Sequence, residues 1–198
     1  YDGPLGTLEL GPGGRDTRKL QMAGALCAPG FIVTTGSPFD ERSPFQGVRH
    51  CEIPVGDYCA GYLTVEMDRV RFSISNNPFP DASGRTRIGK DLIRGITIRA
   101  DKPFVLDFSH RPVVMFNRPA GNDPVTRGSA VRIEAILVEP VLNTVMRDLA
   151  DLTRSETKLY TTPQGKEATY EGAPALHPRV TIARADGEIV SQGIMPFG

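Results

Sequence analysis

The stretch YLTVEMDRVRFSI, residues 62–74, decides the fold class. Apolar and polar residues alternate along it, and the parity of the apolar positions switches near Met67–Asp68. A half-buried strand alternates with a period of two, whereas an amphipathic helix repeats its apolar positions every three or four residues. A switch of parity indicates a turn or a bulge. We therefore predict a strand, a turn or bulge, and a second strand within these residues.

Further short segments of the same kind follow along the chain. Strands are predicted at 96–99, 104–108, 113–116, 131–137, 180–182 and 189–190. The last two flank Asp186–Gly187, and Asp-Gly between apolar segments predicts a hairpin because a type I′ turn needs positive φ. Turn residues recur about every 8–12 positions, which is typical of all-β sandwiches and barrels.

The length of 198 residues favours one domain with a sizeable core. We predict a single, mainly β domain over 1–198: an antiparallel β-sandwich, immunoglobulin-like in the broad sense. A β-barrel is one alternative. Two small β domains meeting near 117–129 are another, because Pro, Gly, Asn and Asp are frequent there. Residues 36–60 form the longest irregular stretch, and we expect them to be a surface loop.

One segment departs from the strand pattern. Its apolar residues fall at helical spacing: Val138, Val141, Leu142, Val145, Met146, Leu149 and Leu152. This pattern predicts one short helical crossover near 139–151, with Pro140 in the first turn, where a missing N–H costs little. The alternative is that the strand at 131–138 continues past a kink at Pro140.

Composition excludes several classes of protein. The 23 basic and 23 acidic side chains give zero formal net charge, which argues against a nucleic-acid binder driven by bulk charge. A hydrophobic content of 39% argues against a disordered chain. No apolar run approaches the roughly 18 residues of a membrane span. No motif indicates a cofactor, so we expect none.

The three cysteines, Cys27, Cys51 and Cys59, are too few for a disulfide-dense scaffold. Seven residues separate Cys51 from Cys59, including Pro54 and Gly56, and this is enough chain to turn. We therefore predict a Cys51–Cys59 disulfide. A bridge from Cys27 to either of the other two, or no bridge at all, remains open.

A local basic stretch is the leading candidate for a binding site. Residues 69–99 hold seven basic and two acidic side chains. Within it Arg69 and Arg71 share one parity, as do Arg85 and Arg87, so pairing of the two segments would align four guanidinium groups. Arginine binds carboxylates, sulfates and phosphates in a bidentate manner. These four residues are the predicted anion-binding face; the alternative is a solvated sheet face balanced by acids elsewhere.

Other constellations are weaker. The sequence Asp81-Ala82-Ser83-Gly84 resembles a fragment of a calcium loop, but an Asx turn explains it more simply. Asp107, Ser109 and His110 hold the residue types of a hydrolytic triad, yet neighbours on a strand face opposite ways. No ligand spacing joins the histidines and cysteines, and Asp148 with Asp151 is most simply a solvated pair. We expect no catalytic and no metal site from these sets.

Three hypotheses for function follow. The leading one is a non-catalytic exported binding or structural module, which contacts an anionic glycan or a protein partner through the Arg-rich face. The second is a hydrolase of envelope polymers with acids on its loops, and the third is an oligomeric shell or filament subunit. The chain begins at Tyr1 without a Met, which is compatible with export, so the expected location is periplasmic, cell-surface or secreted.

Overall fold

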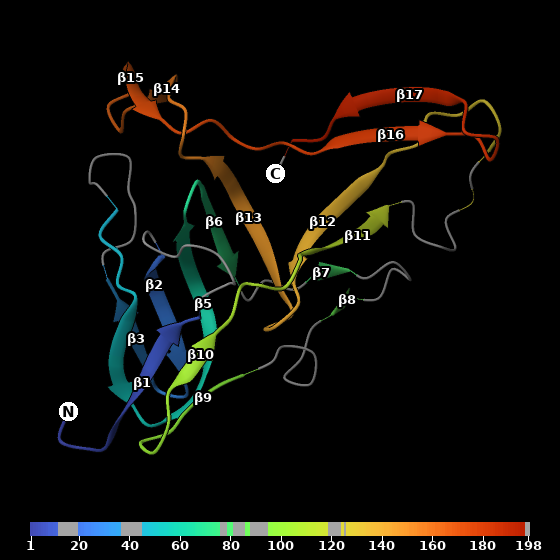
Figure 1. Cartoon of the computed structure of the whole chain (residues 1–198). Coiled ribbons are helices and arrows are strands. Elements are labelled where there is room, and N and C mark those ends of the chain that lie inside the picture. The colour runs from blue at the N-terminus through green and yellow to red at the C-terminus, as the bar shows by residue number, and fades with distance from the viewer. Residues whose placement is uncertain are drawn as a thin grey trace.

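The computed structural model describes residues 1–11, 20–36, 45–75, 79–80, 86–87, 95–118, 124 and 126–196, and their regular structure is entirely β (Figure 1). The strands are β1 (Leu5–Leu10), β2 (Gln21–Ala28), β3 (Phe31–Thr35), β4 (His50–Pro54), β5 (Gly56–Met67), β6 (Val70–Ser75), β7 (Phe79–Pro80), β8 (Thr86–Arg87), β9 (Ile96–Ile98), β10 (Phe104–Leu106), β11 (Val113–Arg118), β12 (Glu134–Glu139), β13 (Thr144–Asp151), β14 (Glu156–Thr161), β15 (Glu167–Gly172), β16 (Arg179–Ala183) and β17 (Ile189–Ile194). Within the described residues, no helix is long and apolar enough to cross a membrane.

The largest sheet has eight strands. Its order is β11-β12-β13-β6-β5-β2-β3, and β9 pairs with a further part of β5. A second sheet has the order β10-β1-β4, in which β1 runs parallel to β10 and antiparallel to β4. Two-stranded sheets form from β7–β8, β14–β15 and β16–β17. Among the described strands no sheet closes on itself, so the barrel alternative finds no support in them.

One hydrophobic cluster joins the two larger sheets. From β1 it takes Leu8 and Leu10, and from the facing sheet it takes side chains such as Leu63, Val65 and Ile74. All five are fully buried, and burial of each contributes about 1.5–3 kcal/mol relative to exposure. The alternation of apolar and polar residues in 62–74 follows from this one-sided burial. The predicted strand–turn–strand is confirmed: β5 and β6 are joined by a two-residue turn, and Asp68 in it has a φ of 52°.

The prediction of a helix over 139–151 is wrong. These residues form the turn and second strand of a hairpin, since β12 and β13 pair antiparallel around a turn at 140–143. The apolar residues serve two surfaces at once: Leu142 and Met146 pack into the main cluster, whereas Val145 belongs to a small cluster on the opposite face of the sheet. A strand that buries both faces loses its period of two, so its apolar residues fell at helical spacing by coincidence.

The expected loop over 36–60 is also wrong over its second half. Residues 50–60 form β4 and the start of β5, and Val48 is bridged to Met22 of β2 by two backbone hydrogen bonds. Residues 37–44 lie outside the described residues. So does part of the alternative domain boundary at 117–129, and the single-domain prediction stays a prediction.

The last two hairpins form separate two-stranded sheets and lie at the top of Figure 1. The chain between them, at Pro174–Leu176, runs along the end of β13 and hydrogen-bonds to it: Asp151 N donates to Pro174 O, and Leu176 N donates to Leu149 O. The predicted hairpin around Asp186–Gly187 is confirmed as β16–β17. Gly187 has a φ of 91°, which is the reason a glycine suits that turn.

Candidate functional site

The Arg-rich face is described only in part. Arg69 is exposed in the turn between β5 and β6, and Arg71 lies on β6 directly opposite Glu66 of β5. Arg85 lies outside the described residues, and of Arg87 only the backbone, in β8, is described. The alignment of four guanidinium groups therefore stays a prediction.

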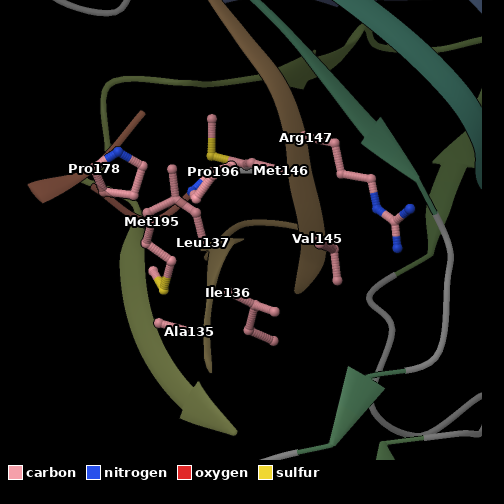
Figure 2. A pocket seen from close by; sticks show the side chains of 9 residues that line it. All are labelled: Ala135, Ile136, Leu137, Val145, Met146, Arg147, Pro178, Met195 and Pro196. Carbon is pink, nitrogen blue, oxygen red and sulfur yellow. The ribbon is translucent and has the colours of Figure 1, made fainter. Parts of the chain in front are cut away.

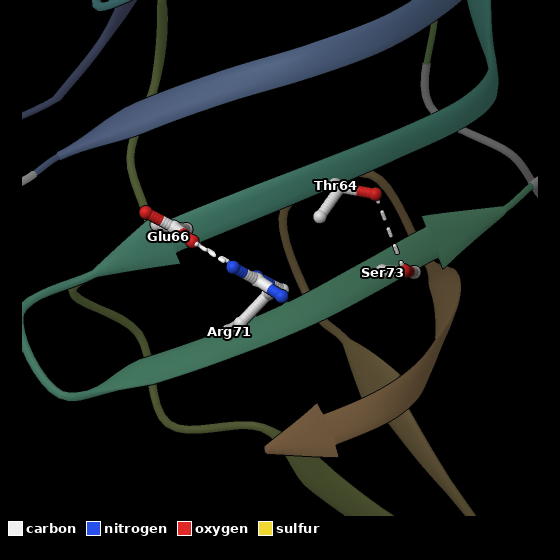
Figure 3. A network of polar contacts seen from close by, with 4 residues as sticks. All are labelled: Thr64, Glu66, Arg71 and Ser73. Carbon is white, nitrogen blue, oxygen red and sulfur yellow. Dashed lines mark hydrogen bonds and ion pairs between the residues drawn. The ribbon is translucent and has the colours of Figure 1, made fainter. Parts of the chain in front are cut away.

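Arg71 already has partners within the protein. Its Nε and Nη2 donate to Glu66 Oε1 at 2.9 and 2.5 Å (Figure 3). Its guanidinium also lies 5.6 Å from the centre of the Phe45 ring. Both charged side chains are only 18% exposed. Because a half-buried pair is screened less by solvent than an exposed one, this charge is largely balanced where it lies. Of the two arginines of this face whose side chains are described, Arg69 is the more exposed to solvent.

We predict that Arg71→Ala lowers the free energy of unfolding by about 1–2 kcal/mol, because it removes two charge-assisted hydrogen bonds and leaves Glu66 half-buried without them. Arg69→Ala is the matched control and should cost less than about 0.5 kcal/mol, since its side chain is exposed. Urea denaturation of both variants measures the difference. Equal stability of the two would show that the Glu66 pair contributes nothing.

A row of hydroxyl groups continues from this ion pair along the same face of β5 and β6. Tyr62 Oη lies 2.9 Å from Ser73 Oγ, and Thr64 Oγ1 lies 3.5 Å from the same atom (Figure 3 draws the latter contact). Tyr62 also donates to Asp148 Oδ2 at 3.5 Å, which reaches the neighbouring strand β13. Thr64 and Ser73 are buried. These groups satisfy one another, so the arrangement ties three strands together on the face opposite the main core.

The predicted Cys51–Cys59 disulfide is not present, and all three cysteines are free thiols. Cys51 lies on β4 opposite Leu8 and packs against the main cluster. Cys59 lies between two core residues of β5, Tyr58 and Ala60, so it points to the other face of its sheet. The two thiols therefore lie on different sheets and point in different directions. Burial raises the pKa of the Cys51 thiol, which keeps it protonated.

Two of the remaining sequence candidates, Asp107 and Asp151, form structural turns. Asp107 Oδ1 accepts a hydrogen bond from Ser109 N at 2.9 Å, and this bond is the largest cause of its lowered pKa. A carboxylate held in this way closes an Asx turn and is a poor proton acceptor. Asp151 closes a similar turn through Thr153 at the end of β13. The Asp81–Gly84 segment lies outside the described residues, and within those that are described no three His, Cys, Asp or Glu gather as metal ligands.

A shallow groove lies where the C-terminal hairpin meets the main sheet (Figure 2). Its floor comes from β12 and β13, for example Leu137 and Met146, and its wall from Pro178, Met195 and Pro196. Arg147 is the titratable residue of its lining, and Figure 2 shows its guanidinium pointing away from the methionine and proline side chains. This lining suits packing of apolar chain and offers no acid or nucleophile for catalysis.

The C-terminal hairpin itself is covered with exposed apolar side chains. On β16 and β17, Ile182, Ile189, Val190 and Ile194 are 40–66% exposed. Edge strand β11 resembles it, with exposed Val113, Val114 and Phe116. The sequence pattern predicted both segments as strands but did not predict their exposure. The available signal was that apolar residues occur in succession there, as in Val113–Val114 and Ile189–Val190, and so on both faces.

In a comparison with known proteins, no family model, no curated protein and no solved structure matches this chain.

Proposed function

We propose that this chain is a non-catalytic, exported structural module that assembles with a protein partner through the hairpin β16–β17, and that the partner is a second copy of the chain. The observation that carries the proposal is the exposure of Ile182, Ile189, Val190 and Ile194 on a hairpin that pairs with no other described strand. We call these four residues the hairpin patch.

An uncovered hairpin of this kind is poorly stable. Two antiparallel strands alone are marginal in water and need a third strand or an apolar cover on one face. The strands β16 and β17 pair with each other, and Met195 N donates to Pro178 O where the hairpin begins and ends. Exposed apolar surface marks interaction sites in soluble proteins, and here it lies on both faces of the hairpin, since the register puts Ile182 and Ile194 on opposite sides. A partner that covers the hairpin patch would provide the missing contact.

Two features favour a second copy as that partner. The strand β17 pairs only with β16 among the described strands, and β11 pairs only with β12, so both offer backbone N–H and C=O groups along an open edge. Both edges carry apolar side chains, so they suit each other. The zero formal net charge also leaves little repulsion between copies. A contact between β17 of one copy and β11 of the next would be heterologous, and such contacts build rings or filaments.

The described surface supports a non-catalytic role over the hydrolase hypothesis. The groove beside β12 and β13 is lined by Arg147 and otherwise by apolar side chains, and the acids Asp107 and Asp151 are engaged in turns. We further propose that the two larger sheets pack as a β-sandwich, immunoglobulin-like in the broad sense. The single core cluster that joins Leu8 of β1 to Leu63 of β5 supports this arrangement. Export from the cytoplasm stays a prediction of the sequence.

Size-exclusion chromatography with light scattering tests the assembly on the full chain, over about a hundredfold range of concentration. We expect the average mass to rise above the 21.5 kDa of one chain as concentration increases. The double variant Ile182→Ser/Ile194→Ser should weaken self-association by at least about tenfold, because it removes apolar contact without adding charge.

The matched control is Leu159→Ser on β14, which is 64% exposed but lies on the other hairpin. It should associate as the wild-type chain does, with circular dichroism showing that all variants are folded. A wild-type chain that stays at 21.5 kDa throughout would overturn the proposal, as would equal association of the double variant. A monomeric chain that captures an unrelated protein through the hairpin patch would also overturn it.

A further inference from the structure

The register of the largest sheet brings two of the three cysteines together. Cys27 on β2 is the direct antiparallel partner of Cys59 on β5. Directly opposed residues of antiparallel strands have Cα atoms about 4.5–5.5 Å apart, and a disulfide needs about 4.4–6.8 Å. The backbone spacing at this pair therefore already meets the requirement for a bridge.

Both side chains also leave the sheet on the same side. Their neighbours Leu26 and Ala60 are paired with each other and buried in the main cluster, so Cys27 and Cys59 face away from that core. Each is half-buried, which leaves access for a small reagent. Opposed Cβ atoms on one face lie about 4.5–5.5 Å apart, so a modest movement of the strands brings them to the spacing of a bridge.

The two thiols already reach toward the opposite strand. Cys59 Sγ lies 3.6 Å from Cys27 O, and it donates to that carbonyl. Cys27 Sγ lies over Gly61 of β5, where a Cβ would stand only 2.7 Å from it. Gly61 is the extra residue of a bulge, since Ala25 pairs with Tyr62 and Leu26 with Ala60. The bulge gives the Cys27 thiol room to change rotamer beside Cys59.

We propose that Cys27 and Cys59 form a disulfide across β2 and β5 when the chain meets an oxidised low-molecular-weight disulfide. One protein thiolate attacks a sulfur of the small disulfide and forms a mixed disulfide, and one small thiolate leaves. The second protein thiolate then attacks the protein sulfur of that mixed disulfide, and the second small thiolate leaves. Two protein thiols are thereby oxidised and the small disulfide is reduced, and the two small thiolates take up the two protons that the protein thiols released.

Cys51 does not compete in this exchange. It lies on β4 in the other sheet, faces the main cluster, and has no cysteine as its register partner. The Cys27–Cys59 bridge would instead connect two neighbouring strands of the largest sheet and enclose β3 and β4 in its loop. Because a bridge over such a loop restricts the unfolded chain, we expect the melting temperature to rise by about 5–10 °C.

The test equilibrates the full wild-type chain with oxidised glutathione, blocks remaining thiols with iodoacetamide, and maps a non-reduced digest by mass spectrometry. We expect one alkylated cysteine, Cys51, and one linked pair of peptides containing Cys27 and Cys59. The Cys51→Ser variant should form the same bridge. The variants Cys27→Ser and Cys59→Ser should each form no bridge and keep the reduced melting temperature.

Three results would overturn the proposal. They are three alkylated cysteines at equilibrium, a bridge that includes Cys51, or glutathione adducts on Cys27 or Cys59 that do not resolve into the bridge. The wild-type map decides between these outcomes and the expected one even where a serine variant fails to fold.

Discussion

Replacing Gly24 by alanine should be the most damaging small substitution in the described part of this chain, lowering the free energy of unfolding by about 4–5 kcal/mol. Gly24 lies in β2 with a φ of 139°, a backbone conformation that residues with a side chain rarely adopt. A Cβ there would stand 2.1 Å from Tyr62 O, which belongs to the neighbouring strand β5. The oxygen is backbone in the middle of the largest sheet, so no side chain can rotate away to relieve the clash.

Urea denaturation at equilibrium measures this loss, and Gly95→Ala is the control. Gly95 precedes β9, and a Cβ there would meet only Tyr58 O at 3.6 Å, an ordinary contact. The control should unfold within about 1 kcal/mol of the wild-type chain. A Gly24→Ala protein of similar stability to the control would mean that β2 and β5 can separate at this point, contrary to the close approach described above.

The alternation around residues 62–74 predicted its structure because β5 and β6 bury one face in a large core and leave the other polar. Leu63, Val65 and Ile74 face the main cluster, whereas Thr64 and Ser73 face away. The period of two is then visible in the sequence itself. Gly24 carries no such signal, since its conformation depends on the approach of a strand about forty residues further along the chain.

The pairing of the cysteines was equally beyond what the local sequence could predict. Chain spacing favoured Cys51 with Cys59, because seven residues allow a turn. The structure instead places the free thiols of Cys27 and Cys59 opposite each other in the register of β2 and β5, and sheet order is not encoded in local spacing. Exposure of the hairpin patch likewise depends on how distant described segments pack, which local spacing does not show. Strand positions were therefore predictable to a useful degree, whereas partners and faces were not.

The wrongly predicted helix leads to the second large effect, which concerns Glu139. This carboxylate is buried at the end of β12, and it accepts hydrogen bonds from Val141 N and Leu142 N, both at 2.7 Å. A helix N-cap makes bonds of this kind to the second and third residues after it. The local chemistry is thus that of a first helical turn, but Asn143 adopts a φ of 54° and the chain turns back as β13.

Glu139→Gln should lower the free energy of unfolding by about 2–3 kcal/mol, because the amide keeps one acceptor and turns an NH₂ group toward a backbone N–H. Glu139→Ala, which leaves both N–H groups without this partner in a buried turn, should cost about 3–5 kcal/mol. Glu134→Gln on the same strand is the control: its partners Arg118 and Arg132 lie at the surface, so the cost should stay below about 1 kcal/mol.

If Glu139→Gln loses no more free energy of unfolding than its control, the β12–β13 turn is held by its apolar contacts, and the two backbone hydrogen bonds are dispensable. If the predicted order is observed, a single buried carboxylate maintains the hairpin whose strands floor the groove beneath the C-terminal segment.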